Sequence, residues 1–309
     1  MPDPGAPAVL VIQPMLVARK AALEAIGCRV VEGWDAPAED LDQVRAILHW
    51  GPLETERLAR LPKLGVIALI TAGYDGIDLD WCRSRGIAVT HARGVNADDV
   101  ADHALALMLA AWRGIIASDR HVRDGGWGKV RRPQGRSLTG RKLGVVGLGH
   151  VGAAVARRAE AFGLQVSWWG PNPKPAPWPR AGSLLNLAAE SDILVVASRA
   201  DASNTGLISR EVIAALGPQG LLVNVARGSV VDEDALIAAL RSGGLGGAAL
   251  DVFIEEPTPA ERWADVPNVV LTPHDAGGTI ETVPRMAALA VENIRLHLAG
   301  APLTAEVPA

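Results

Sequence analysis

The sequence predicts an α/β protein whose main domain is a doubly wound parallel sheet. The first observation is the alternation of short apolar runs with segments of helical spacing, because strands joined by helical crossovers form parallel sheets. The second is the motif Gly147-Leu148-Gly149-His150-Val151-Gly152, which follows the apolar run 143–146 and precedes an Ala-rich segment. Strand, glycine turn and helix in this order are typical of Rossmann-type units that bind dinucleotides.

The N-terminal third predicts a smaller parallel sheet with helices on both faces. Apolar runs bounded by Gly, Pro and Asp mark its strands, and segments of helical spacing lie between them. The predicted strands are 8–12, 29–32, 46–48, 64–70 and 87–90, with helices at 17–26, 54–60 and 81–85.

The rest of the chain predicts a long helix, a long loop and a second strand–helix series. Val100, Ala104, Leu107 and Ala111 recur at helical spacing, which predicts a helix over 98–112, and the loop then extends to Thr139. The predicted strands are 143–146, 165–169, 193–197, 221–225, 248–252 and 269–271, with helices at 153–162, 232–241 and 283–298. Six strands with crossovers fit one doubly wound sheet.

The three glycines of the motif have separate mechanical roles in a cofactor site. Gly147 permits the tight turn, Gly149 lets a pyrophosphate approach the backbone, and Gly152 lets helix and strand pack closely. The N-terminus of the helix that follows offers N–H groups and partial positive charge to phosphates. The alternative is a simple packing turn, since glycine is abundant in this chain with 33 residues.

Composition limits the class of protein. A length of 309 residues suggests two domains, and 49% hydrophobic residues suffice for sizeable cores. The formal charge of −4 argues against a nucleic-acid-binding surface. No apolar run is long enough to span a bilayer, and the N-terminus does not read as a signal peptide. Cys28 and Cys82 form no motif, so we expect ordinary thiols in a reducing cytoplasm.

Three complementary charged or titratable groups follow the last strands of the second series. Arg227 follows strand 221–225, Glu256 follows strand 248–252, and His274 follows strand 269–271. Ligands of open parallel sheets bind beyond the carboxyl ends of strands, so these groups share the edge of the glycine turn. A guanidinium binds a carboxylate through two hydrogen bonds, and an imidazole held by a carboxylate can donate a proton to a reduced carbonyl. Singly, each could instead be an ordinary surface group.

The remaining histidines have no motif partners. We interpret them as structural or exposed, although His150 lies in the glycine turn and is a candidate phosphate contact. No spacing typical of metal ligands occurs, and we therefore expect no metal site. The histidines without partners are His49, His91, His103, His121 and His297.

At these motifs the sequence resembles the D-isomer-specific 2-hydroxyacid dehydrogenases over nearly the whole chain. The resemblance is carried by the glycine motif and by three further segments in family order. Within the family, the chain is most similar to glyoxylate, hydroxypyruvate and hydroxyphenylpyruvate reductases. The further segments are Val223-Asn224-Val225-Ala226-Arg227-Gly228, Leu250-Asp251-Val252-Phe253 with Glu256-Pro257, and Thr272-Pro273-His274.

The resemblance implies a role for each site residue. Arg227 would bind the substrate carboxylate, His274 would be the acid–base group, and Glu256 would be its partner. Asp251 would lie at the carboxamide side of the nicotinamide. The turn Ala72-Gly73-Tyr74 would offer backbone N–H groups to the substrate from the other domain. The expected cofactor contacts are Gly147, Leu148, Gly149, His150, Val151, Gly152, Asn172, Lys174, Ala226, Asp251 and Gly277.

The resemblance also implies a split domain organisation. Residues 1–95 and 282–309 would form a flavodoxin-like substrate-binding domain, and 96–281 the dinucleotide-binding domain. The helix 98–112 and the loop to Thr139 would form the contact of a homodimer, or alternatively would be ordinary core packing.

The favoured function is reduction of a small 2-keto acid, such as glyoxylate or hydroxypyruvate, to the D-2-hydroxy acid with NAD(P)H. The partner would thus be a small molecule. One alternative is a nicotinamide-sensing protein without catalysis, because corepressors share this fold. Another is phosphoglycerate dehydrogenase, which usually carries a C-terminal regulatory domain, whereas this chain ends at Ala309.

The end of strand 165–169 predicts the choice of cofactor. NAD-specific sites usually place an acid there to bind the ribose hydroxyls, and this strand continues into Gly170-Pro171-Asn172-Pro173-Lys174 without one. Asn172 can donate a hydrogen bond and Lys174 supplies a charge, which favours NADP(H) with measurable use of NAD(H). Related NADPH reductases often carry an Arg near Gly170 or Pro171, and this chain departs from them there. The alternative is a rigid turn with Lys174 in solvent.

Overall fold

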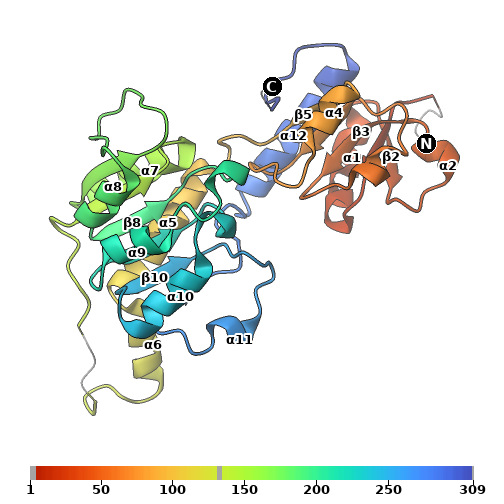
Figure 1. Cartoon of the computed structure of the whole chain (residues 1–309). Coiled ribbons are helices and arrows are strands. Elements are labelled where there is room, and N and C mark those ends of the chain that lie inside the picture. Colours follow the sequence, from red (N-terminus) through yellow and green to blue (C-terminus); the bar gives the residue numbers. More distant parts are fainter. Residues whose placement is uncertain (1–4, 131–133, 308–309) are drawn as a thin grey trace. The chain divides into compact units, whose positions relative to one another are not determined.

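The computed structural model describes residues 5–130 and 134–307 and divides into two compact units. Unit 1 comprises Met1–Asn96 with Gly278–Ala309, and unit 2 comprises Ala97–Gly277. Both units are parallel α/β sheets, which confirms the predicted fold class (Figure 1). The outer ends of the predicted domains and part of the predicted loop to Thr139 lie outside the described residues.

Unit 1 is a five-stranded parallel sheet in the order β2-β1-β3-β4-β5, which is the flavodoxin-like order. α1 and α12 cover one face, where Leu23 and Ile294 join the apolar residues of the strands. Leu41, Leu58 and Cys82 of α2, α3 and α4 cover the other face. The elements are β1 (Ala8–Val11), η1 (Pro14–Arg19), α1 (Lys20–Ala25), β2 (Arg29–Glu32), α2 (Ala38–Leu41), β3 (Val44–His49), α3 (Thr55–Leu58), β4 (Val66–Leu69), α4 (Leu79–Ser84), β5 (Ala88–Thr90) and α12 (Thr282–Leu298).

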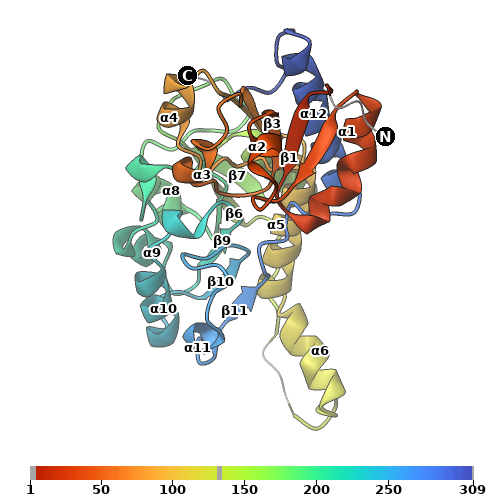
Figure 2. The same cartoon turned by 90° about the vertical axis from the view of Figure 1, so that its right-hand side faces the viewer.

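Unit 2 is a six-stranded parallel sheet in the order β11-β10-β9-β8-β6-β7. α5 and α7 pack together on one face, and α8, α9 and α10 cover the other (Figures 1 and 2). The chain adds β7 on one side of β6 and β8 on the other. The crevice between the turns after β6 and β8 is therefore the switch point at which ligands of such sheets bind. The strands are β6 (Lys142–Val146), β7 (Gln165–Trp169), β8 (Ile193–Val196), β9 (Leu221–Asn224), β10 (Gly247–Leu250) and β11 (Val269–Leu271). The helices are α5 (Ala97–Trp112), α6 (Ile115–Arg123), α7 (His150–Ala161), α8 (Leu184–Glu190), η2 (Ala202–Asn204), α9 (Arg210–Leu216), η3 (Gly228–Val230), α10 (Glu233–Ser242) and α11 (Ala260–Trp263).

The expectation of an uninterrupted loop from 113 to 139 is wrong, because this segment contains α6. No residue of α6 is buried, although Ile115, Ile116 and Val122 are apolar. Gly114, at a φ of +61°, starts the helix and makes the segment resemble a turn. Among the described residues no single helix is long and apolar enough to cross a membrane, and α5 and α6 meet this criterion only as a pair bent by 58°.

Three histidines of unit 1 link its stability to pH. Burial is the main cause that lowers the pKa of His49, His91 and His297 below the ordinary value of 6.5. His49 Nε2 lies 3.0 Å from the Pro52 carbonyl oxygen, and His91 Nδ1 lies 2.7 Å from that of Ala72. The folded protein therefore binds protons less readily than the unfolded chain. The neutral histidines therefore contribute to the free energy of unfolding above about pH 6.5. This contribution decreases as the pH falls below that value.

We accordingly expect the melting temperature to fall between pH 7.5 and pH 5.5, measured by circular dichroism. The double variant His49→Gln/His91→Asn should show a weaker pH dependence, because both amides can donate a similar hydrogen bond and neither side chain titrates. Asp119→Asn on exposed α6 is the control. An unchanged pH dependence in the double variant would contradict the assignment to these two histidines.

Candidate active site

The glycine turn lies at the switch point of the sheet in unit 2. Gly147 has a φ of +88°, and a Cβ there would lie 2.5 Å from Ser198 Cα in the turn after β8. A Cβ on Gly152 would lie 2.0 Å from the Gly147 carbonyl oxygen, so a larger residue would push α7 off the turn. Among the described residues, no atom beyond the adjoining backbone lies within 4 Å of the position of a Cβ on Gly149. Gly147 and Gly152 are thus needed for packing, whereas Gly149 leaves open space.

This open space fits the pyrophosphate of a dinucleotide. Gly149 is the N-cap of α7 and provides no side-chain cap, so the first N–H groups of the helix are available to an anion. Ser198 Oγ is buried and has no hydrogen-bond partner within the described residues. His150 is exposed at the first position of α7, and Val151 beside it is partly buried. The uncapped N–H groups and the orphaned hydroxyl give the turn the donors that a phosphate needs.

Arg227 is held at the end of β9 by a buried amide. Asn224 is 1% exposed; its Oδ1 accepts from the Ala226 N–H at 3.0 Å, and its Nδ2 donates to the Arg227 carbonyl at 3.0 Å. Arg227 Nη1 donates to the Ala226 carbonyl at 2.7 Å, and the side chain is partly buried. The turn that presents the guanidinium is therefore rigid. Asn224 positions it, a role that the sequence analysis did not assign.

Glu256 and His274 form a close pair across the ends of β10 and β11. His274 Nδ1 lies 2.6 Å from Glu256 Oε2, and Glu256 Oε1 accepts from the Phe253 N–H at 3.0 Å. Both side chains remain partly exposed to solvent, at 41% for His274 and 36% for Glu256. Because Nδ1 faces the carboxylate, the pair orients the ring so that Nε2 is its other hydrogen-bonding atom.

His274 adopts an unusual backbone conformation. Its φ is +54°, in the left-handed region, where few residues other than glycine occur. Such a conformation persists only where the surrounding structure holds it, and it is frequent at functional sites. The bonds that hold it come from Asp251.

Asp251 clamps the segment that carries His274. Its buried carboxylate accepts from the Thr272 hydroxyl at 2.6 Å, before His274 in the chain. It also accepts from the backbone N–H groups of Asp275 and Ala276, both at 3.1 Å, after His274. One carboxylate thus fixes the chain on both sides of the left-handed residue.

His103 of α5 extends this clamp. Its Nε2 lies 2.9 Å from Thr272 Oγ1. A hydroxyl has one hydrogen, which Thr272 donates to Asp251, so His103 Nε2–H must donate to Thr272 Oγ1. The hydrogen bonds therefore run from His103 through Thr272 to Asp251. Only the fold reveals this chain, because its members are far apart in the sequence.

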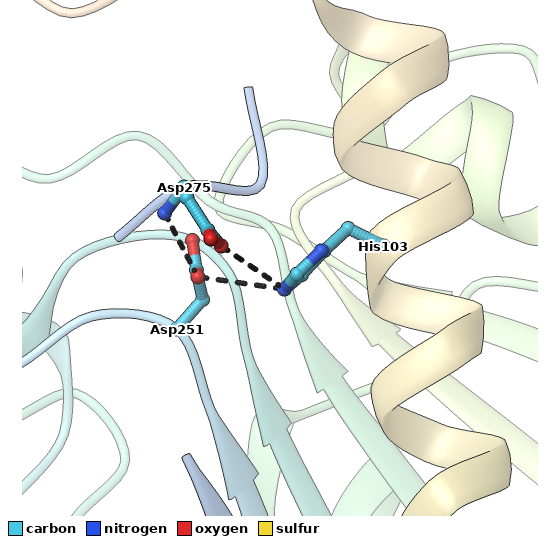
Figure 3. Close-up of side chains that lie close together, drawn as sticks. All are labelled: His103, Asp251 and Asp275. Atoms are coloured by element: carbon cyan, nitrogen blue, oxygen red, sulfur yellow. Dashed lines mark hydrogen bonds and ion pairs between the residues drawn. The ribbon is translucent and has the colours of Figure 1, made fainter. Parts of the chain in front are cut away.

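His103, Asp251 and Asp275 lie close enough together to be compared with a metal site (Figure 3). His103 Nε2 is 3.5 Å from Asp251 Oδ1 and 3.8 Å from Asp275 Oδ1. However, Asp251 Oδ1 already accepts two hydrogen bonds and Oδ2 a third. Three of its roughly four lone-pair sites are directed to these donors, so a hydrogen-bonded clamp accounts for this cluster.

Removing the Thr272 hydroxyl is expected to impair the clamp. Thr272→Val keeps the shape of the side chain but leaves buried Asp251 without one donor, which should lower the unfolding free energy by about 1–3 kcal/mol. It should also lower kcat, because His274 is no longer held beside Glu256. Thr272→Ser restores a hydroxyl and should recover most of both quantities. Denaturant unfolding and steady-state kinetics measure the two effects, and equal kcat values in Thr272→Val and the native protein would contradict this role.

The loops after β9 and β10 press against each other. A Cβ on Gly228 would lie 1.8 Å from the Phe253 carbonyl carbon, so only glycine fits. The buried carboxylate of Glu233 accepts from the Ile254 N–H at 3.2 Å and pairs with Arg262. These contacts anchor the loop that carries Glu256 beside the turn that carries Arg227. The sequence analysis did not identify Glu233, because an acid in the first turn of a helix reads as an ordinary capping charge.

The predicted substrate-binding turn lies in unit 1, after β4. Thr71 Oγ1 donates to the Gly73 carbonyl at 2.6 Å, and His91 Nδ1 faces the Ala72 carbonyl. The Tyr74 and His91 rings meet edge to face, with centroids 5.2 Å apart. The turn is therefore well ordered within its own unit.

The other expected cofactor residues lie near the glycine turn or the clamp. Lys174 Nζ donates to the Leu148 carbonyl within the glycine turn, so it does not extend freely into solvent. Asn172 is exposed in the segment after β7. Ala226 is buried in the turn before Arg227, and Gly277 directly follows the clamped Ala276.

The chain is similar to known proteins over most of its length. Residues 105–276 match the model of the D-isomer specific 2-hydroxyacid dehydrogenase, NAD binding domain. The chain is 41% identical over 283 residues to hydroxyphenylpyruvate reductase from Plectranthus scutellarioides, which covers 89% of this chain and 90% of that one.

Two solved structures are similar over nearly their whole length. The 2-hydroxyacid dehydrogenase from Ketogulonicigenium vulgare Y25 superimposes with a TM-score of 0.91 at 40% identity, covering 98% of each chain. The NADPH-dependent glyoxylate/hydroxypyruvate reductase from Sinorhizobium meliloti, in complex with NADP and malonate, has a TM-score of 0.89 at 33% identity, with 98% of this chain and 97% of that one covered. The chain has the glycine turn and carries Arg, Glu and His at successive strand ends. Together with these relatives, this shows that the chain belongs to the D-isomer-specific 2-hydroxyacid dehydrogenases, enzymes with a nicotinamide cofactor.

Proposed function

We propose that this chain is a reductase of small 2-keto acids of the glyoxylate and hydroxypyruvate class, with NADPH as the preferred cofactor and the D-2-hydroxy acid as product. The observation that carries the proposal is the His274–Glu256 pair at 2.6 Å, on the same sheet edge as Arg227 and the glycine turn. This arrangement combines a proton donor and a carboxylate anchor beside a dinucleotide site.

Each residue has one task in the reaction. A nicotinamide bound at the glycine turn would supply the hydride. Arg227 binds the substrate carboxylate through paired hydrogen bonds and thereby orients the keto group. His274 donates a proton from Nε2 to the carbonyl oxygen, while Glu256 holds Nδ1 and stabilises the charged ring. Asp251 would adjoin the carboxamide side of a bound nicotinamide, and it keeps His274 in place through the clamp.

The two units have separate roles in this proposal. Unit 2 binds the cofactor through the glycine motif Gly147–Gly152, with Ala226 and Gly277 at neighbouring strand ends. Unit 1 binds the substrate through the N–H groups of Ala72, Gly73 and Tyr74, which the Thr71 and His91 contacts hold in place.

A preference for NADPH is supported by the end of β7. The segment after it, Gly170–Lys174, contains no carboxylate to bind the ribose hydroxyls or repel a 2′-phosphate. Lys174 instead places a cation at the glycine turn, on the Leu148 carbonyl. The Sinorhizobium relative is NADPH-dependent, which agrees with this preference.

A homodimer built through α5 and α6 is part of the proposal. α6 has no buried residue, and its side chains Ile115 and Ile116 are 50% and 43% exposed. Farther along, Val122 and Trp127 are 52% and 80% exposed. A second copy covering this surface would remove these apolar groups from water. Sedimentation equilibrium measures the molecular mass in solution and thereby tests for the dimer.

We place the protein in the cytoplasm, because Cys28 and Cys82 are free thiols.

A panel of 2-keto acids with both cofactors tests the proposed function. Glyoxylate and hydroxypyruvate should oxidise NADPH faster than bulky hydroxyphenylpyruvate does, and NADH should support slower turnover. Absence of turnover with every keto acid, together with tight NADPH binding, would instead favour a nicotinamide-sensing protein. Oxidation of 3-phosphoglycerate in preference to reduction of keto acids would favour the phosphoglycerate dehydrogenase alternative.

A further inference from the structure

The proline-rich segment after β7 folds back along this edge strand. The Trp168 N–H donates to the Pro179 carbonyl at 3.0 Å, and the Ala181 N–H donates to the Trp168 carbonyl at 2.8 Å. Trp168 Nε1 also donates to the Trp178 carbonyl at 3.1 Å. Arg180, ten residues beyond Gly170 in sequence, is thereby paired with Trp168 in a parallel bridge.

This pairing brings the Arg180 guanidinium to the end of β7. Its Nη2 donates to the Gly170 carbonyl at 2.7 Å, and its Cζ lies 5.8 Å from the centre of the Trp168 ring. The Gly147 N–H donates to the Trp169 carbonyl at 2.8 Å, so the same strand end adjoins the glycine turn. Arg180 thus supplies a cation where the local sequence Gly170–Pro171 has none.

The anchored guanidinium retains donors for a ligand. Arginine has five N–H donors, and the Gly170 carbonyl uses one of them. The anchor and the tryptophan ring restrict the side chain before any ligand binds, which reduces the entropy lost on binding. A phosphate monoester carries close to two negative charges at neutral pH and accepts paired hydrogen bonds from arginine. Lys174 on the Leu148 carbonyl adds a second cation on the side of the glycine turn.

We infer that Arg180 is the residue that recognises the 2′-phosphate of NADPH in this protein. The inference rests on the proposed preference for NADPH and identifies the residue that causes it. In a Rossmann-type unit the 2′-position of the adenine ribose lies at the end of the second strand, which is β7 here. Arg180 reaches this position from beyond the proline-rich segment, replacing the arginine that related NADPH reductases carry directly after the strand. Lys174 strengthens the local positive charge without forming the fork of two parallel hydrogen bonds.

Equilibrium binding of two nucleotide fragments tests this inference without relying on turnover. Adenosine 2′,5′-bisphosphate and adenosine 5′-monophosphate differ only in the 2′-phosphate, and isothermal titration calorimetry measures both. Arg180→Ala should weaken binding of the bisphosphate by roughly 10- to 100-fold, because charge-assisted hydrogen bonds are lost, and leave the monophosphate within about twofold. The affinity of Arg180→Lys for the bisphosphate should lie between those of the native protein and Arg180→Ala, because lysine keeps the charge but cannot form two parallel hydrogen bonds.

Arg241→Ala is the matched control, since it removes an exposed arginine from the last turn of α10 in the same unit. It should change neither affinity. If the native protein prefers the bisphosphate and Arg180→Ala keeps the same preference, the inference about Arg180 is overturned while the proposed function stands. If the native protein binds both fragments equally, the proposed preference for NADPH fails, and keto-acid reduction is then judged by the substrate panel alone.

Discussion

Replacing His274 with glutamine is expected to lower kcat by about 10²- to 10⁴-fold, the range that a general acid contributes. The amide cannot donate a proton of suitable acidity to the carbonyl oxygen, whereas it preserves much of the size of the ring. KM for the keto acid should change much less, because Arg227 still binds the carboxylate. Steady-state kinetics with glyoxylate and NADPH measures both parameters.

The two neighbouring glutamates provide a matched control for this prediction. Glu256 contacts His274 Nδ1 at 2.6 Å, whereas adjacent Glu255 is exposed. Glu256→Gln should lower kcat by roughly 10- to 100-fold, since it removes a charged hydrogen-bond partner, while Glu255→Gln should leave it within about twofold. Near-native turnover of His274→Gln would remove His274 from the mechanism, and equal effects of the two glutamate variants would contradict the pairing.

Replacing Arg227 with alanine is expected to reduce kcat/KM for the keto acid by about 10³-fold or more, because the substrate carboxylate loses both its charge partner and its orientation. Arg227→Lys should recover part of this loss, since lysine keeps the charge but cannot form two parallel bonds. The turn should survive both changes, because Asn224 holds it through backbone groups.

Cofactor affinity separates this role from a general loss of structure. The Kd for NADPH, measured by fluorescence titration, should stay within about threefold in Arg227→Ala, because the glycine turn and β7 are unchanged. Arg210→Ala, an exposed arginine at the start of α9, is the control for charge removal. A Kd for NADPH that rises in parallel with the loss of kcat/KM would assign Arg227 to the cofactor instead of the substrate.

The sequence by itself determined the features that depend on local order. Buried strands appear as apolar runs such as 143–146, and the glycine spacing after this run marks a turn where side chains at Gly147 and Gly152 are sterically excluded. The position of Arg227, Glu256 and His274 at a common edge also followed from the sequence, because every strand of a parallel sheet ends on the same side.

The tertiary structure alone decided how distant residues support that site. Thr272 and His103 are 169 positions apart in sequence, yet their hydrogen bond extends the clamp on Asp251. Arg180 reaches the end of β7 only because the chain folds back and pairs with Trp168, so no reading of the residues directly after the strand could find it. α6 was missed for a different reason: Gly114 before it and Gly125-Gly126 after it resemble loop residues, and the apolar residues Ile115, Ile116 and Val122 are not buried in the described structure. Local sequence patterns indicate which residues of a segment are buried. Contacts between distant segments depend on where the whole fold places them.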